Sequence, residues 1–399
     1  MSKSDVQAQY EAYPYPERDP KDERKRLITG SPSLPAEMDH WLWGGARDWS
    51  QPLRALVAGG GTGDALIQLA QTLTDAGRPY EITYIDLSEA SRRIAEKRAK
   101  VRKLKGITFV TGSLLDAGAH GPFDYIDCCG VLHHLDDPQA GFDALAGALG
   151  PEGGMGLMVY APHGRSGVYP LQAAFGAALS GLSPRARLKA ARAIYGKIPD
   201  AHPFKRNARV VDHEKGDAGF YDLLLHSTDR PFSITQLLDA LDAAGLAYAG
   251  TPEPMLYDPA RLTGDLDLPD GVARMQLAED LRGTFKTHVV YARPKGQVLA
   301  PPMGKPEAVP HLRGAPAPAL AQHVANTGQI IIDTAGEAFE FALPRQAANV
   351  IAGIDGRRGL ADIGAGAGLD AIAFGALWSQ VEKALCASGM MHYSRLLTA

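Results

Sequence analysis

The chain has 399 residues, of which 45% are hydrophobic and 22% charged, and its formal net charge is −4. This composition is that of a globular protein with room for two domains, and it excludes a disordered, collagen-like or strongly basic chain. The three cysteines, Cys128, Cys129 and Cys386, are too sparse for a disulfide framework or a zinc site. No apolar run approaches the ~20 residues of a membrane span, and no signal-peptide pattern opens the chain, so we expect a cytoplasmic protein.

Residues 1–50 are rich in proline, tyrosine, tryptophan and charge, and no helix or strand period dominates them. Prolines follow both Tyr13 and Tyr15, and a proline restricts the backbone of the residue before it. We therefore expect a stiff, extended segment that carries two aromatic rings. Two interpretations stay open, namely a lead-in packed on the domain surface and an aromatic cap over a ligand site.

Residues 53–58 form a short apolar run that leads directly into four glycines, Gly59, Gly60, Gly61 and Gly63. This pattern predicts a buried strand and a tight turn at which a ligand can approach the backbone. A helical period begins at Asp64, and residues 80–85 are typical of a second strand with Asp86 at its carboxyl end. A helix N-terminus beside such a loop, with a carboxylate placed for ribose hydroxyls, favours a nucleoside ligand.

The spacing of the glycines discriminates between nucleoside ligands. A dinucleotide fingerprint requires G-x-G-x-x-G, whereas here Asp64 occupies the place of the third glycine and Gly63 comes one residue early. The resulting G-x-G-x-G pattern resembles the first motif of class I S-adenosylmethionine (SAM)-dependent methyltransferases. It argues against a nicotinamide dehydrogenase.

Strands and helices continue to alternate after this unit. Ser88 can cap a helix to about residue 105, and further strands are expected at 107–110, 123–129 and 154–161. Such alternation predicts a parallel α/β sheet with its ligand crevice at the carboxyl ends of the strands. The outer face of the helix after Ser88 holds a row of basic side chains, which indicates a solvated face or, as the alternative, an RNA contact: Arg92, Arg93, Lys97, Arg98, Lys100, Arg102, Lys103 and Lys105.

Residues 53–161 carry GGGTG, the acid in YIDLS, GSLLD and CCGVLHHLDDP, in the order and spacing of consecutive class I methyltransferase motifs. The segments YEAYPYPERDP and YAPHGRSGVYPLQ are similar to those of a bacterial subgroup of that family. The resemblance implies a Rossmann-like, doubly wound sheet of seven strands and SAM as the cofactor. Our first hypothesis is therefore a methyltransferase that acts on an oxygen or nitrogen of a small molecule or of an exposed peptide side chain; the sequence itself does not identify the acceptor.

The family's roles can be carried over position by position. The resemblance implies that Asp86 holds the ribose hydroxyls, that Tyr13 and Tyr15 add to the cofactor site, and that SAM contacts Gly59, Gly60, Gly61, Gly63, Leu87, Gly112, Ser113, Leu114 and Gly130. Ser113 and Val57 both stand where many family members carry an acid. The YPYP segment is therefore a candidate for ordering the methionine ammonium in place of the acid absent at Val57.

Methyl transfer from a sulfonium is a direct displacement, so alignment in a dry pocket is the main requirement and a general base is optional. His133 and His134 follow the fourth predicted strand and are candidates for that base or for polar pocket lining. Further pocket candidates are Tyr160, His163, Arg165 and His226. We expect no metal.

The predicted domain plan is a cap segment at 1–50, a methyltransferase domain at 51–294, a proline-rich linker at 295–320 and a small α+β module at 321–399. A helical insertion at about 162–231 is expected over the crevice, and strands at 246–257 and 287–292 should complete the sheet. The last module weakly resembles winged-helix-like, peptide-binding modules. Residues 362–368, DIGAGAG, imitate a second nucleotide loop, but no apolar strand precedes them and too little chain follows.

Two other functions stay open beside methyl transfer. One is a catalytically reduced SAM- or nucleoside-binding module that docks a protein or peptide partner, because Val57 lacks the expected acid. The other is RNA methylation, which depends on the basic helix alone. The acidic net charge gives no reason to expect a nucleic-acid or membrane partner.

Overall fold

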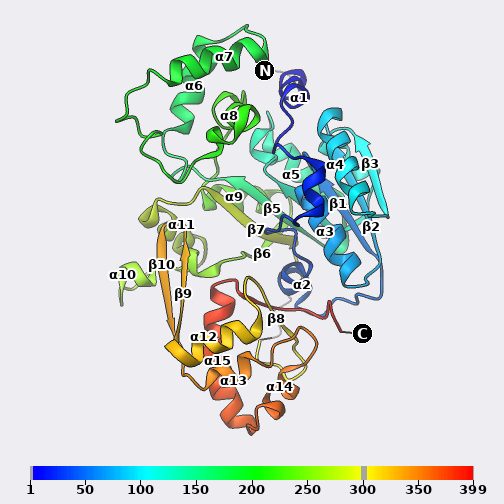
Figure 1. The fold of residues 1–399 in the computed structure, drawn as a ribbon, viewed down its shortest axis with the longest axis vertical. Coiled ribbons are helices and arrows are strands. Elements are labelled where there is room, and N and C mark those ends of the chain that lie inside the picture. Colours follow the sequence, from blue (N-terminus) through cyan, green and yellow to red (C-terminus); the bar gives the residue numbers. More distant parts are fainter. Residues whose placement is uncertain (1–2, 298–302, 399) are drawn as a thin grey trace.

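The computed structural model of the chain describes residues 3–297 and 303–398. Its centre is a seven-stranded sheet of order β3-β2-β1-β4-β5-β7-β6 (Figure 1). The strands are β1 (Leu53–Ala58), β2 (Tyr80–Asp86), β3 (Ile107–Thr111), β4 (Phe123–Cys129), β5 (Leu149–Tyr160), β6 (Leu246–Gly250) and β7 (Thr287–Pro294). Only β7 runs antiparallel to its neighbours. The predicted Rossmann-like sheet with a final antiparallel hairpin is confirmed.

Helices cover both faces of this sheet, because each carries one apolar stripe that the sheet buries. On one face, α2 (Pro35–Trp43), α3 (Asp64–Asp75) and α4 (Glu89–Val101) pack on the β1 residues Ala55 and Val57. On the other face, α5 (Pro138–Gly147) and α9 (Ile234–Ala243), which α11 (Gly271–Arg282) flanks, pack on Leu56 and Ile126. Both layers leave the carboxyl ends of β1, β2 and β4 at one open edge.

Local signals fix several element ends. The Ser88 side chain accepts a hydrogen bond from the Ser91 N–H at 3.1 Å, as its predicted role as a helix cap requires. The helix ends at Val101, earlier than expected, and Lys103 then takes a left-handed φ of 57°. The strand predicted at 246–257 is too long: β6 ends at Gly250, and Pro254, which has no N–H for a strand ladder, opens a 3₁₀ turn, η5 (Pro254–Tyr257).

The first 50 residues are more regular than the sequence indicated. They form α1 (Lys3–Ala12), the 3₁₀ turn η1 (Pro20–Arg24) and α2. Helix α2 starts with Pro35 at its first position and ends at Gly44, which has a φ of 62°. Met38 and Leu42 of this helix are buried in the core on the sheet, so α2 belongs to the helical layer of the sheet domain and not to a cap.

The chain between β5 and α9 folds as a helical insertion above the sheet (Figure 1). It contains α6 (Val168–Ala178), α7 (Pro184–Tyr195), the 3₁₀ turn η4 (Asp212–Glu214) and α8 (Gly216–Leu225). These elements share a core of their own that includes Phe175, Phe204, Phe220 and Leu224. The insertion is thus a helical unit with its own core, and it lies at the same end of the sheet as α1 (Figure 1).

The chain after β7 forms a second compact unit at the other end of the molecule (Figure 1). Its elements are β8 (Pro310–Leu312), α12 (Ala317–Thr327), β9 (Gln329–Thr334), β10 (Glu337–Ala342), α13 (Ala347–Ile351), α14 (Leu360–Gly366), α15 (Ala371–Ala387) and β11 (Met391–Tyr393). The linker expected at 295–320 is therefore too long, since β8 and the start of α12 lie inside it, while residues 298–302 lie outside the described chain. The likeness to winged-helix modules stays a prediction.

Buried carboxylates fasten this C-terminal unit to the sheet domain. Glu37 of α2 accepts hydrogen bonds from the Tyr291 hydroxyl at 2.6 Å and from Arg313 at 2.7 Å. Asp39 accepts from the Ser394 hydroxyl at 2.7 Å. Both carboxylates are almost fully buried, so the two units share one polar interface. Within the described residues, no single helix has the length and apolarity for a membrane span; α14 and α15 pass such a test only together, as a pair bent by 113°.

Candidate functional site

The glycine loop at residues 59–63 leaves β1 at the open edge and enters α3. Gly59, Gly61 and Gly63 have positive φ values of 65°, 51° and 101°. A Cβ atom on Gly59 would lie 2.5 Å from a Val131 methyl carbon, and one on Gly61 would lie 2.9 Å from the Tyr15 carbonyl oxygen. Both positions require glycine for conformation and for space, because L side chains avoid this region and the neighbours include backbone.

Asp86 ends β2 directly beside this loop. One carboxylate oxygen accepts a hydrogen bond from the Gly61 N–H at 2.8 Å, and the other accepts from the Ser88 N–H at 2.8 Å. Burial raises the pKa of this carboxyl, while the two backbone N–H groups act against that rise. The structure therefore brings together the loop and the acid that the sequence predicted as the ribose side of a nucleoside site.

The residues expected around an adenine lie next along the same edge. The Gly112 N–H donates to the Asp86 carbonyl oxygen at 2.9 Å, which ties the end of β3 to the end of β2. Ser113 is buried, and its hydroxyl caps the 3₁₀ turn η2 (Leu114–Ala119) by accepting from the Leu115 N–H at 3.3 Å. A hydroxyl thus occupies the place where many relatives carry an acid.

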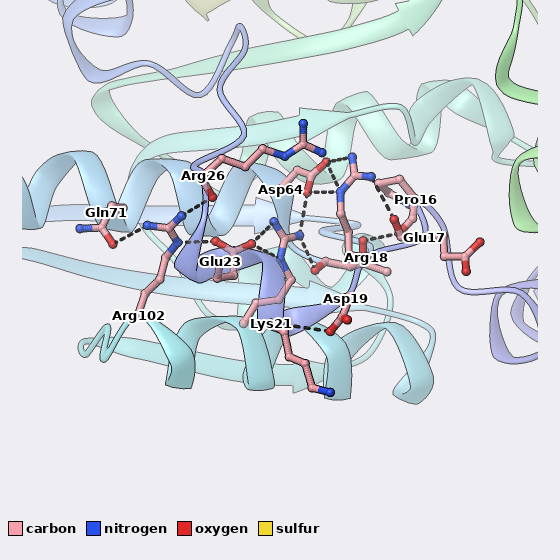
Figure 2. Close-up of polar contacts among 12 residues, drawn as sticks. Pro16, Glu17, Arg18, Asp19, Lys21, Glu23, Arg26, Asp64, Gln71 and Arg102 are labelled. Atoms are coloured by element: carbon pink, nitrogen blue, oxygen red, sulfur yellow. Dashed lines mark hydrogen bonds and ion pairs between the residues drawn. The ribbon is translucent and has the colours of Figure 1, made fainter. Parts of the chain in front are cut away.

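The N-terminal segment lies across the loop. The Thr62 hydroxyl donates to the Pro16 carbonyl at 2.6 Å, and the Arg18 guanidinium binds both oxygens of Asp64 (Figure 2). Helix α1 lies over the neighbouring strand end, where the Ser88 hydroxyl donates to the Tyr10 carbonyl at 3.2 Å. These contacts show that the segment is packed on the loop and on the end of β2, which both a packed lead-in and an aromatic cap require.

The two aromatic residues of the YPYP segment have different surroundings. Tyr15 presents its carbonyl oxygen to Gly61 and its ring is partly buried. Tyr13 instead stacks on Tyr221 of α8, with ring centroids 5.0 Å apart. The structure therefore supports a place for Tyr15 beside the glycine loop, whereas Tyr13 connects the segment to the insertion.

Two arginines of the basic stretch 92–105, Arg98 and Arg102, are not part of a free basic face. Arg98 is only 1% exposed; its guanidinium pairs with Glu23 and with Asp64, each at 2.7 Å. Arg102 also binds Glu23 and reaches the Arg26 carbonyl at 2.6 Å (Figure 2). The prediction of a solvated face or an RNA contact is wrong for these two residues. They hold the N-terminal segment against the loop, and no periodicity in the sequence could show that partner.

His133 and His134 end the short turn η3 (Leu132–His134) after β4, and both are buried. The Tyr160 N–H faces His133 Nδ1 at 3.4 Å, which assigns the ring proton to His133 Nε2. His134 Nδ1 lies 2.8 Å from the Thr228 carbonyl and therefore carries a proton, which leaves the lone pair on His134 Nε2. Of the two candidates, only His134 has a ring nitrogen placed to accept a proton.

Residues of the insertion complete a buried polar cluster around this pair. The His226 ring stacks on His134 at 3.7 Å between centroids, and its Nε2 faces the Tyr10 hydroxyl at 3.3 Å. Tyr10 in turn donates to Asp222 at 3.0 Å. Burial lowers the pKa of His226 and raises the pKa of the Asp222 carboxyl, so desolvation favours neutral forms for both.

Arg165 and Tyr160 form the other side of the cluster. The Arg165 guanidinium lies 3.5 Å above the Tyr160 ring centroid and 3.4 Å from Asp229. Sequence reasoning had named Tyr160, Arg165 and His226, and the structure brings these three together. It leaves His163 outside, exposed beside Asp280 at 3.5 Å. Tyr10, Asp222 and Asp229 were missed because only the fold brings α1 and the insertion to this edge.

Two groups of three side chains in the cluster place their ligand atoms within 4.8 Å of one another: His133, His134 and Asp229, and His134, Asp222 and His226. The rings of His134 and His226 lie only 19° from parallel. Ring lone pairs lie in the ring plane, so those of the two histidines run side by side and do not converge on one ion. We therefore interpret the group of His134, Asp222 and His226 as a hydrogen-bonded one, to which the Tyr10 hydroxyl also belongs.

A buried carboxylate lies one strand away from Val57. Asp127 of β4 lies beside Val57 in the parallel register. It accepts from the Ser33 hydroxyl at 2.6 Å, and its other oxygen finds no hydrogen-bond partner among the described residues. Burial raises the pKa of Asp127 to about 6. Sequence reasoning overlooked it because an acid inside a buried strand matched no motif.

Comparison with known proteins adds the family context. Residues 56–155 match the model of a methyltransferase domain. An uncharacterized protein of Synechococcus is 31% identical over 279 residues, covering 66% of this chain and 63% of its own length. A tRNA 5-carboxymethoxyuridine methyltransferase of Escherichia coli is 30% identical over 120 residues, covering 29% of this chain and 42% of its own. The chain thus spans less than two thirds of either relative.

Among solved structures, PKMT2 from Rickettsia typhi superposes with a TM-score of 0.64 at 16% identity. The match covers 92% of this chain and 77% of that one. The same protein in complex with AdoHcy superposes with a TM-score of 0.61 at 13% identity, over 91% and 75% of the two chains. At these identities the likeness establishes a shared fold.

Proposed function

From the premise that this chain carries a class I methyltransferase domain, we propose that it binds SAM at the glycine loop and transfers its methyl group to an acceptor. The acceptor atom is an oxygen or nitrogen of a small molecule or of an exposed peptide side chain. One observation supports this most: the loop after β1, Asp86 after β2 and the polar cluster after β4 meet at one edge of the sheet.

The residues at this edge fit the parts of SAM. Gly59 and Gly61 let the backbone approach a ligand without a Cβ, and Asp86 offers a carboxylate for the ribose hydroxyls. We assign the methionine ammonium to the neighbourhood of the Tyr15 carbonyl, because that oxygen lies against Gly61 where the family's acid is absent. The contact from Gly59 to Val131 couples the loop to the turn that bears the histidines.

When bound, SAM supplies an electrophilic methyl group on a sulfonium, and the acceptor's lone pair displaces the sulfur. The chain's own residues then align the reactants and exclude water, since α1 and the insertion cover this edge. If the acceptor loses a proton, His134 Nε2 takes it as general base, because that atom carries the free lone pair of the cluster. His133 donates through Nε2 and orients the acceptor.

The structure gives different support to the two alternative functions, RNA methylation and a binding module without methyl transfer. RNA methylation depended on the basic helix, but Arg98 and Arg102 are occupied by Glu23 inside the protein. These two arginines therefore give no support to an RNA contact, whereas the exposed cations of the stretch are Arg93, Lys97, Lys100, Lys103 and Lys105. A binding module without transfer stays the second candidate, supported by Val57 and by the firmly docked C-terminal unit.

The test is transfer of a tritiated methyl group from SAM to a cell extract that has been separated into protein, RNA and small molecules. We expect label in the small-molecule or protein fraction, and we expect His134→Asn to reduce the rate while SAM affinity stays within about twofold. Label in RNA alone would contradict the proposal. SAM binding without transfer to any fraction would favour the binding module instead.

A further inference from the structure

A cavity of about 720 Å³ opens within the insertion. Its wall comes from α6, from the connection between α6 and α7, and from residues 226–229 after α8. The lining includes Tyr169, Gln172, Leu182, Arg187, His226 and Asp229. Its volume lies in the range that holds a small organic molecule, and its lining mixes polar side chains with apolar ones from α6 and the connection after it.

Arg187 gives this cavity an uncompensated positive charge. The side chain is 91% buried and shares a hydrogen bond with Tyr221 of α8. Its Nε finds no hydrogen-bond partner, and no carboxylate lies within ion-pair distance of it, among residues 3–297 and 303–398. A buried cation without a counter-ion is costly, so such a site favours an anionic ligand.

The acidic residue on the same wall does not supply that counter-ion. Asp229 is already paired with Arg165 at 3.4 Å and accepts from the Gln172 amide at 2.9 Å. It therefore presents little free charge to the cavity. The unmatched charge of the lining is that of Arg187.

The cavity also borders the polar cluster of the proposed site. His226 contributes to the lining and stacks on His134. Asp229 contributes as well, and its Oδ1 and His133 Nε2 are both buried polar atoms without a partner in the described chain. A hydroxyl or amine at this end of the cavity, where His226 and Asp229 lie, is therefore next to the ring that stacks on His134, the base of the proposed reaction.

We propose that this cavity binds the methyl acceptor and that the acceptor is a small carboxylic acid. Its carboxylate pairs with Arg187, and its hydroxyl or amine points to the end lined by His226 and Asp229. The role of the bound acid as methyl acceptor rests on the proposed function. The binding of the acid itself does not depend on methyl transfer.

The experiment is a ligand-observed NMR titration of the full chain with benzoate and, in parallel, with the uncharged isostere benzamide. We expect saturable benzoate binding that is about tenfold or more tighter than benzamide binding, because a charged partner is lost in the amide. Arg187→Gln should remove that preference while keeping a donor for Tyr221, and Arg187→Lys should keep part of it. Arg185→Gln, on the exposed face of α7, is the matched control and should behave as the wild type.

Three results would overturn the proposal: no saturable benzoate binding by the wild type, equal affinities for benzoate and benzamide, or an unchanged preference in Arg187→Gln. Calorimetry with SAM on the same samples shows whether a negative result concerns the acid site in the cavity or the proposed SAM site. Loss of the acid site with intact SAM binding refutes the cavity assignment alone, whereas acid binding without SAM binding refutes the methyltransferase site alone.

Discussion

Two glycine-rich stretches, residues 59–63 and residues 364–368, have similar sequences and different structures. The first leaves the carboxyl end of β1, and three of its glycines have positive φ values. The second begins inside α14, where Gly364 and Gly366 are helical, and only Gly368 has a positive φ, of 69°. Glycine spacing alone therefore does not define a nucleoside loop; the strand before it does.

The glycines of the two stretches also pack against different neighbours. A Cβ on Gly59 would meet Val131, at the turn that carries the two histidines, and one on Gly61 would meet the Tyr15 carbonyl. A Cβ on Gly364 would meet the Phe374 ring of α15 at 3.0 Å. The first set clears room at the open edge of a sheet, whereas Gly364 allows two helices to pack closely.

The largest expected difference concerns the arginines beside the two stretches. Arg98→Ala should destabilise the protein by about 3 kcal/mol, because the buried Glu23 then keeps only Arg102 as a cationic partner and Asp64 loses one of its two arginines. Arg358→Ala, near the second stretch, removes an exposed pair with Asp355 at 2.8 Å and should cost less than about 1 kcal/mol. Urea denaturation followed by tryptophan fluorescence measures both, and equal losses would refute the role of Arg98 as a clamp.

The second difference concerns the glycines themselves. Gly59→Ala should weaken SAM binding by about 100-fold or more, because the new Cβ overlaps Val131 at a left-handed position. In Gly366→Ala the nearest neighbour of the new Cβ is Arg358 Nη1 at 3.9 Å, so SAM affinity should not change and helix α14 should gain about 0.5–1 kcal/mol. Calorimetry with SAM checks the pair; a tight complex with Gly59→Ala would contradict the assignment of the loop.

The third expected difference is in pH dependence: the docking of the C-terminal unit should depend on pH, whereas the stability of β1 should not. His40 accepts from the Tyr393 N–H of β11 at 3.1 Å, and burial lowers its pKa to about 3. A lowered histidine pKa gives stability that is present above the unfolded pKa of about 6.5 and is lost as the pH falls toward the folded pKa. From pH 7 to pH 5 the docking of the C-terminal unit should weaken by about 2 kcal/mol for this residue.

Hydrogen exchange of the β11 amides at pH 7 and pH 5 follows that loss. His40→Asn, which keeps an acceptor for Tyr393 without a titrating ring, should reduce the pH dependence, and the part that remains is that of the buried His311 and His392. The amides of β1 serve as the internal comparison and should keep their protection. A pH dependence that is identical in His40→Asn and in the wild type would rule out His40 as its source.

The smallest expected difference concerns the acids. Asp86→Ala should weaken SAM binding by about 10- to 30-fold, since one set of hydrogen bonds to a charged partner is lost. Asp362→Ala, in the exposed first turn of α14, should leave SAM affinity unchanged. Competition of unlabelled SAM against a labelled analogue compares the two variants, and equal affinities would reject the ribose role of Asp86.

Much of the sheet domain was predictable because its signals are local. The apolar run before Gly59, the acid after residues 80–85 and the cap at Ser88 each depend on a few neighbouring residues. The order of the motifs then predicted the sheet topology through the family resemblance. The second glycine stretch was rejected on the same local evidence, and the structure shows a helix there.

Contacts between distant segments were not predictable in this way. Nothing in the helical period of residues 88–105 indicates that Arg98 is buried against Glu23, which lies 75 positions earlier. Tyr10, Asp222 and His226 meet only because α1 and the insertion converge over the edge of the sheet. Strands of three residues such as β8 and β11 carry too short a pattern to be distinguished from a linker.

Calorimetric titration of the wild-type chain with SAM tests the central claim most directly. The account predicts one saturable site per chain, and the same site should bind the demethylated product S-adenosylhomocysteine in competition. Absence of binding by both compounds would contradict the assignment of residues 59–63 and Asp86 as a SAM site.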